Sequence, residues 1–212
     1  MESEKSLNKI VIGLIIVIIA ITAFFIFKPN SGITGDVVYE SPKGEEFGFV
    51  KSQIGNIPIY TLTVYVHYSD QLIKPYEIPL RNQPKDLEEI PIQDGIRTKI
   101  LSSTGIFLTM DPNLDAKVTV AAIQLAKVLG NADFGVFKIP TQGAFTSLEE
   151  TAPDYPVITC NNATAQTKVI LLEQGDENKA SIEGNCVIIE GTDPDNLIKV
   201  SEKVVLNLLN VM

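Results

Sequence analysis

An uninterrupted apolar run near the N-terminus constrains this chain more than any other feature. Residues 10–27, IVIGLIIVIIAITAFFIF, hold no charge and a single hydroxyl, that of Thr22. A helix of about 18 residues is roughly 27 Å long, which matches the hydrocarbon thickness of a bilayer. Buried core helices rarely reach this length without a polar face. The run therefore predicts a transmembrane helix over residues 10–27 in contact with the lipid bilayer.

A cleaved signal peptide is the main alternative reading of this segment. Signal-peptide apolar regions are about 7–15 residues long and end at small residues. This run is longer and ends in the bulky residues FFIF. Lys5 and Lys9 flank its first end, whereas Lys28 is the only nearby cation at the other. We therefore expect a retained single-pass anchor in the cell membrane, with residues 1–9 in the cytoplasm and the C-terminal part outside.

The sequence after the anchor divides into a linker and one domain. Residues 28–46, KPNSGITGDVVYESPKGEE, are rich in Gly, Pro, Ser and charge, which predicts a flexible tether. Residues 47–212 are enough for one domain with a substantial core. From Pro29 onward the chain carries 24 acidic and 14 basic side chains. This acidic balance gives no electrostatic basis for binding nucleic acid or anionic lipid.

Residue alternation predicts several strands in this domain. Residues 57–68, IPIYTLTVYVHY, place alternate side chains on two faces, which is the period of a pleated strand. Further strands are predicted at residues 47–54, 76–80, 106–110, 133–140, 169–172, 180–182 and 187–190.

Two helices are predicted, each after an Asp-Pro pair. Asp111 and Asp193 suit the N-cap position, and the proline that follows each suits the first helical position. Apolar residues then recur at helical spacing in both segments, and Gly130 ends the first. We therefore expect an α+β domain in which two main helices cover one face of a mixed or antiparallel sheet.

Several strings in the domain resemble one group of proteins. They are YEIPLRNQPKDLEEIPI, the TMDP before an Ala-rich helix, and PVITCNNAT, GNCVIIEG and DNLIKVSEKVVLNLLNVM near the end. Together they look like uncharacterised single-pass membrane-anchored envelope proteins of small-genome (DPANN-type) archaea. The resemblance covers most of the chain after the tether. It implies an archaeal envelope location and a paired-cysteine module before a terminal helix, and it supplies no catalytic residues.

The sequence contains no recognisable catalytic or metal-binding motif. His67 is the only histidine and lies in a strand pattern, so a histidine-based metal cluster and a Ser-His-Asp triad both lack their ligands. A P-loop and a G-x-G-x-x-G motif are absent. The acidic turn at residues 173–178 lacks the spacing of a calcium loop. We expect no catalytic residues, no metal site and no cofactor.

Cys160 and Cys186 are the only cysteines. Two are too few for a Cys₄ zinc site, and their spacing rules out a C-x-x-C redox pair. They are either two buried free thiols or one disulfide, and an extracytoplasmic domain lies in an oxidising compartment. The strands between them let the chain double back. We expect a structural disulfide that closes a loop of about 26 residues.

Asn162, Ala163 and Thr164 form the only N-x-S/T sequon in the chain. The sequon lies in a polar stretch beside Cys160, as expected of an exposed loop. On an outer cell surface Asn162 is therefore a candidate glycosylation site.

Two classes of function fit these features. The first is an anchored envelope protein that presents its domain for binding or assembly, with an envelope protein or a glycan as partner. The alternative is an anchored extracytoplasmic hydrolase that uses Asp and Glu side chains alone. The lone histidine and the lack of a nucleophile–base set favour the first. A deep cleft with two facing carboxylates would favour the second.

Overall fold

The structure is a computed structural model that describes residues 35–67, 73–131, 133–148 and 154–212. No helix within these ranges is both long and apolar enough to span a membrane. The predicted tail at residues 1–9 and the predicted anchor at residues 10–27 lie outside them. The described part is the domain that follows the predicted anchor.

The first sheet is antiparallel, with four strands in the order β1-β2-β3-β4. Its strands are β1 (Asp36–Glu40), β2 (Glu46–Ile54), β3 (Ile57–His67) and β4 (Ile73–Leu80). Along β3, Tyr60, Leu62 and Val66 are buried, whereas Thr63 and Tyr65 are exposed. This is the alternation that the sequence predicts, and it gives the sheet one inward apolar face and one exposed face.

β1 lies inside the stretch predicted to be a flexible tether, so that prediction is wrong for residues 35–46. Val37 and Tyr39 pack against the core. The Gly, Pro and Ser residues that suggested a tether belong in part to the tight turn between β1 and β2. In this turn Gly44 has a φ of 79°, and the backbone N–H of Glu45 donates to Ser41 Oγ at 3.1 Å. The folded domain therefore begins earlier than predicted.

Five strands form a second sheet in the order β6-β5-β7-β9-β8. They are β5 (Gly105–Met110), β6 (Thr141–Phe145), β7 (Thr167–Gln174), β8 (Lys179–Glu183) and β9 (Cys186–Gly191). β5 runs parallel to β6 and β7, β7 runs parallel to β9, and β8 is antiparallel to β9. The α+β class is confirmed, but the strands divide between two sheets instead of forming the single sheet expected.

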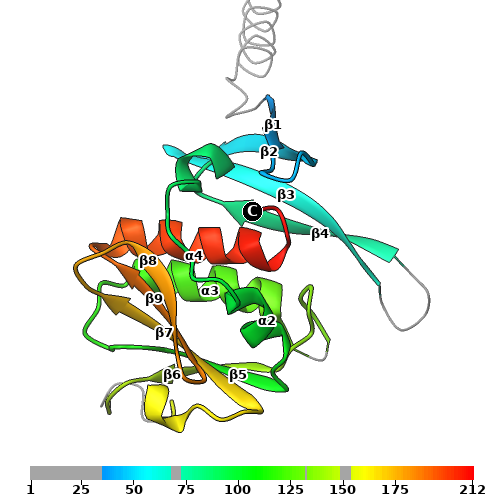
Figure 1. Cartoon of the computed structure of the whole chain (residues 1–212). Coiled ribbons are helices and arrows are strands. Elements are labelled where there is room, and N and C mark those ends of the chain that lie inside the picture. The colour runs from blue at the N-terminus through cyan, green and yellow to red at the C-terminus, as the bar shows by residue number, and fades with distance from the viewer. Residues whose placement is uncertain (1–34, 68–72, 132, 149–153) are drawn as a thin grey trace, which may run out of the picture.

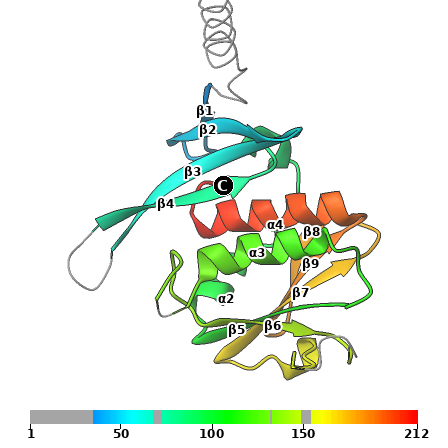
Figure 2. The same ribbon diagram turned by 180° about the vertical axis from the view of Figure 1, so that it is seen from behind.

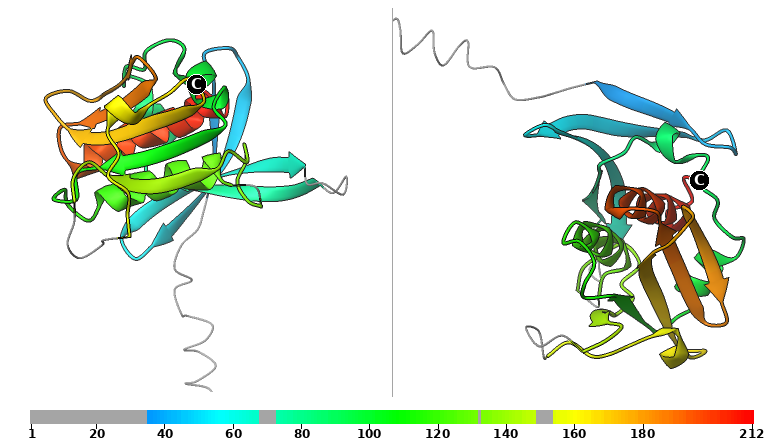
Figure 3. Two further views of the ribbon diagram at one scale, coloured as in Figure 1. Left: turned by 90° about the horizontal axis from the view of Figure 1, so that it is seen from below. Right: turned by 90° about the vertical axis from the view of Figure 1, so that its left-hand side faces the viewer.

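Two main helices, α3 (Val118–Leu129) and α4 (Pro194–Leu208), lie between the two sheets (Figures 1 and 3). The same three layers are visible from behind (Figure 2). α4 is buried on almost every side, as expected of a helix that has neighbours all round. A short helix, α2 (Ile96–Leu101), and a 3₁₀ turn, η1 (Pro84–Leu87), lie in the connection between the two sheets.

α4 begins at the Asp-Pro pair from which the sequence predicts a helix. Asp193 is its N-cap, and the Asp193 Oδ1 atom accepts a hydrogen bond from the backbone N–H of Asn196 at 2.8 Å. Pro194 occupies the first helical position, where its missing N–H costs nothing.

The prediction that Asp111 caps a helix is wrong, because α3 begins at Val118. Asp111 Oδ1 instead accepts a hydrogen bond from the backbone N–H of Asn113, and Asp115 Oδ1 accepts one from the N–H of Lys117. Such local side-chain bonds compete with helical bonds for the backbone. They hold two successive turns before the helix starts.

Residues 133–140, predicted as a strand, instead cover the end of α3. The backbone N–H groups of Val136 and Phe137 donate to the carbonyl of Val128 at 2.9 and 3.1 Å. The last carbonyls of a helix have no partner within the helix. This segment satisfies two of them, because the N–H of Ile139 also donates to the carbonyl of Leu129 at 2.9 Å, so these N–H groups are not available to a sheet. The strand that follows, β6, begins only at Thr141.

Candidate functional site

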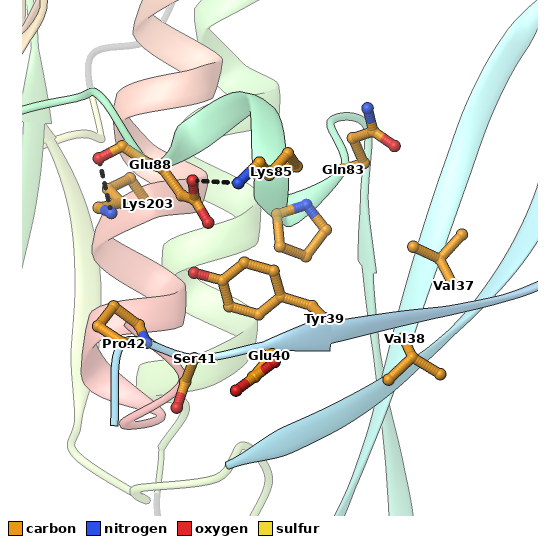
Figure 4. A pocket seen from close by; sticks show the side chains of 11 residues that line it. Val37, Val38, Tyr39, Glu40, Ser41, Pro42, Gln83, Lys85, Glu88 and Lys203 are labelled. Atoms are coloured by element: carbon orange, nitrogen blue, oxygen red, sulfur yellow. Dashed lines mark hydrogen bonds and ion pairs between the residues drawn. The ribbon is translucent and has the colours of Figure 1, made fainter. Parts of the chain in front are cut away.

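A cleft of about 620 Å³ opens beside β1 (Figure 4). Residues 37–42 line one side, and residues 83–85 with Glu88 and Lys203 line the other. Consecutive strand residues point to opposite faces of a sheet. Because residues of both faces of β1 line the cleft, the cleft runs along the free edge of this strand.

The backbone of β1 presents unpaired groups to the cleft. β1 pairs only with β2, through bonds that include Lys51 N–H to the Gly35 carbonyl and Ser41 N–H to the Glu45 carbonyl. Bonded positions alternate along an antiparallel strand, so the N–H and C=O groups of Val38 and Glu40 point away from β2. Within the described part of the chain these groups have no hydrogen-bond partner. The cleft therefore contains an open strand edge.

A buried hydroxyl lies beside this edge. Tyr39 is only 5% exposed, lines the cleft and directs its hydroxyl toward Glu88 (Figure 4). Burial raises the pKa of Tyr39, and the neighbouring Glu88 carboxylate raises this pKa further. The two groups do not meet hydrogen-bond geometry, and the Tyr39 hydroxyl has no partner among the described residues. A buried polar group without a partner is rare in a folded protein.

Two lysines flank the Glu88 carboxylate. Lys85 Nζ lies 2.9 Å from Glu88 Oε2, and this contact lowers the pKa of Glu88. Lys203, on α4, donates from Nζ to the Glu88 carbonyl at 3.3 Å, and burial lowers the pKa of Lys203. The cleft thus combines two carboxylates, those of Glu40 and Glu88, with two ammonium groups and a phenol around an open strand edge.

These groups do not stand out together in the sequence, because β1 lies within the stretch that its Gly, Pro and Ser content predicts to be a tether. A signal was present: residues 36–40, DVVYE, contain three good strand formers in a row between two turn-forming stretches. Their alternation covers only five residues, too few to stand out beside the surrounding Gly and Pro. Glu88 and Lys203 are distant in sequence and meet only through the fold.

The predicted disulfide is present, between Cys160 and Cys186, with their Cα atoms 5.2 Å apart. Cys186 is the first residue of β9 and is fully buried, and Cys160 begins a 3₁₀ turn, η2 (Cys160–Asn162). Just before this turn, the Thr109 hydroxyl donates to the Ile158 carbonyl at 2.7 Å. The disulfide therefore fastens the segment before β7 onto the second sheet, away from the cleft.

Asn162 is exposed at the end of η2. Its Oδ1 atom accepts a hydrogen bond from the backbone N–H of Thr159 at 2.8 Å. The Thr164 hydroxyl of the sequon accepts one from the N–H of Thr167 at 3.0 Å. The sequon is therefore an ordered turn at the surface, held close to the disulfide.

The carboxylates of the cleft do not face one another. Glu40 points away from Tyr39 and Glu88 (Figure 4). A second acidic pair, Glu173 and Glu190, lies on neighbouring strands β7 and β9. Burial, followed by the charges of Glu190 and Glu183, raises the pKa of Glu173. A glycosidase needs two carboxylates about 5–10 Å apart that flank a bond in a cleft, and the cleft beside β1 does not offer that arrangement.

A separate apolar groove of about 390 Å³ lies between α3 and the edge strand β6. Its walls include Met110, Ile123, Phe145 and Tyr155, with few polar groups. Specific sites usually need a small number of placed polar groups to orient a ligand. The cleft beside β1 supplies such groups from both backbone and side chains, so it is the stronger candidate.

Comparison with known proteins adds no relatives. Scans against protein-family models, curated proteins and solved structures each found no significant match to this chain.

Proposed function

We propose that this protein is a membrane-anchored binding or assembly protein whose domain lies outside the cytoplasm and presents the cleft beside β1. The observation that carries the proposal is the bond between Cys160 and Cys186. Structural disulfides persist in oxidising compartments and are rare in the cytosol. Both cysteines of the chain are used in this bond, which supports a structural role.

The apolar run at residues 10–27 supports attachment to a membrane, with residues 1–9 inside. Because β1 begins at Asp36, the link between the anchor and the first strand is only residues 28–35. Eight residues reach at most roughly 28 Å when fully extended. The first sheet and its cleft would therefore stay close to the outer face of the membrane, where other envelope components are concentrated. An archaeal cell envelope agrees with the resemblance of the sequence, and Asn162 would be available there for a glycan.

The cleft supports a binding function more than catalysis. It offers hydrogen-bonding groups and charges, but its carboxylates are not opposed across a cavity. Protein or glycan partners fit this chemistry, whereas the acidic surface gives no reason to expect nucleic acid.

Site-specific labelling tests the proposed topology. In a Cys160→Ser/Cys186→Ser background, one variant carries Asp176→Cys, an exposed position in the domain, and a matched variant carries Ser6→Cys in the tail. A membrane-impermeant maleimide added to intact cells should label position 176 and leave position 6 unlabelled until lysis. The opposite pattern would refute the proposal. In wild-type cells, alkylation of denatured protein before and after reduction should find Cys160 and Cys186 oxidised.

A further inference from the structure

We propose that the free edge of β1 takes up an extended peptide of a partner protein as an additional strand, and that this peptide carries cationic side chains. The inference rests on the proposed binding function and names the partner for the same cleft. Main-chain bonds to Val38 and Glu40 would provide affinity, and the side chains around the edge would provide selectivity.

The two edges of the first sheet differ in a way that points to β1. At the opposite edge, β4 carries Pro75 and Pro79, which cannot donate backbone hydrogen bonds. Proline on an edge strand is a common protection against unwanted strand pairing. β1 contains no proline, opens into a cleft, and includes Val38, whose side chain is 63% exposed. Of the two edges of the first sheet, as far as the structure describes them, that of β1 is therefore the one without proline and the one open to another strand.

The side-chain charges beside the β1 edge indicate which peptide sequences would bind there. Asp36, Val38 and Glu40 share the exposed face of β1, and Glu46 lies directly opposite Glu40 on β2. The nearby cations are directed elsewhere. Lys43 Nζ donates to Asn210 Oδ1 at 2.7 Å, and in the cleft Lys85 pairs with Glu88 and Lys203 donates to the Glu88 carbonyl. Side chains directly opposite on paired strands interact most strongly. A peptide with Lys or Arg at two positions four apart, and an apolar residue midway between them, matches this face.

The same charges disfavour a second copy of the chain as the occupant. Antiparallel pairing of two β1 strands centred on Val38 uses all the free backbone groups of the edge. It would place Asp36 of each copy opposite Glu40 of the other, and like charges directly opposite are destabilising. The negative charges along this edge therefore favour a partner strand that carries positive charges.

On the inner face, the peptide residues between the two cations would lie beside Val37 and Tyr39. A Ser or Thr hydroxyl there would offer the Tyr39 hydroxyl the hydrogen bond that it lacks among the described residues. The preferred sequence is thus of the type Lys-Thr-Val-Thr-Lys. This pattern reads the same in both directions, so it serves a parallel or an antiparallel strand equally.

Peptide binding to the full chain in detergent micelles tests the inference. The probe is fluorescein-labelled Ser-Lys-Thr-Val-Thr-Lys-Ser with both ends blocked, and the control probe has Glu in place of each Lys. Fluorescence anisotropy should show binding of the basic peptide to the wild type and weaker binding of the acidic one. The double variant Asp36→Lys/Glu40→Lys should reverse this preference.

A matched pair of variants separates strand addition from general charge attraction. Val38→Pro removes an N–H that faces the cleft and leaves the bonds to β2 intact. The affinity for the peptide should therefore fall about tenfold or more, as expected when at least one hydrogen bond is lost. Val38→Thr keeps the N–H and should bind clearly more tightly than Val38→Pro. Thermal melting should show that both variants are folded.

Equal binding to Val38→Pro and Val38→Thr, or no binding of the basic peptide to folded wild type, would overturn the inference. The labelling of positions 176 and 6 is independent of the cleft. A domain that is outside the cell and oxidised, yet does not bind the basic peptide, would leave the proposed location intact while removing strand addition.

Discussion

Gln124 on α3 donates a hydrogen bond from Nε2 to Glu202 Oε1 on α4 at 2.6 Å, in the buried layer between the two sheets. The Glu202 carboxylate also accepts bonds from the backbone N–H groups of Arg81 and Asn82 and from Asn82 Nδ2. One fully buried side chain thus connects both main helices to the end of the first sheet. Four donors satisfy the oxygens of this carboxylate.

Glu202 should make stability depend on pH. Burial raises its pKa, although its four hydrogen bonds act in the opposite direction. Between the unfolded value of about 4.3 and the raised folded value, the folded state binds more protons than the unfolded state. The contribution of this group to the free energy of unfolding therefore falls as pH rises through that window. Denaturant melts at several pH values should show this slope in the wild type.

In Glu202→Gln the part of the slope that comes from this carboxyl should disappear, because the amide does not titrate. Its NH2 group replaces an oxygen that accepts two N–H donors, so stability at neutral pH should fall. Glu202→Leu should cost more, about 3 kcal/mol, because all four buried donors lose their acceptor. Exposed Glu89 offers a control, and Glu89→Gln should retain the wild-type slope. An unchanged slope in Glu202→Gln would exclude this carboxyl as its source.

Loss of the disulfide should lower stability substantially. A cross-link that closes a loop of 26 residues is expected to contribute roughly 3–4 kcal/mol by restricting the unfolded chain. Cys160→Ala/Cys186→Ala should therefore unfold at a clearly lower urea concentration than oxidised wild type. Reductant should shift the wild type toward the variant and leave the variant unchanged. Coincident melts of oxidised wild type and variant would contradict the expected contribution.

The two Asp-Pro pairs allow a direct test of where the helices begin. Asp193→Ala removes the N-cap of α4 and should cost about 0.5–2 kcal/mol. Asp111→Ala removes only two hydrogen bonds from Asn113 within an exposed turn, so it should cost no more than about 0.5 kcal/mol. Chemical denaturation of both variants gives the comparison. Similar losses in the two would indicate that Asp111 also supports a helix.

Tyr39→Phe should separate stability from binding. The Tyr39 hydroxyl is buried without a partner, so its removal should leave stability unchanged or raise it by about 1 kcal/mol. The same change should weaken binding of the Lys-Thr-Val-Thr-Lys probe. Tyr65→Phe, at a position 71% exposed on the same sheet, should alter neither property. A clear loss of stability in Tyr39→Phe would show that the hydroxyl has a structural role.

Local sequence signals predicted the structure correctly where an element is determined by residues close to it in the chain. The alternation along β3 and the Asp193 cap depend on neighbours only a few residues away, and both predict the observed elements. The cysteine pairing followed from the small number of alternatives. The strand alternation and the helix cap each arise from interactions within a short segment.

Predictions failed where contacts with distant segments of the chain determine the local structure. Residues 133–140 have strand-forming composition, yet their N–H groups cap α3 at Val128. β1 is too short to be recognised without its partner β2. The division into two sheets and the meeting of Tyr39, Glu88 and Lys203 depend on how α4 inserts between the layers. Glu202 had a detectable signal, because it lies between apolar residues at helical spacing, Ile198 and Leu206, on a helix that is buried all round.

The central position of α4 also sets the order in which the domain can be completed. Every strand of both sheets is synthesised before this helix, yet fully buried residues such as Phe49 and Ile170 face the layer that α4 fills. A nascent chain that lacks α4 therefore lacks much of the layer that covers the apolar faces of both sheets. On the proposed topology, the domain would complete its fold only after the segment that carries Glu202 has reached the outside of the membrane.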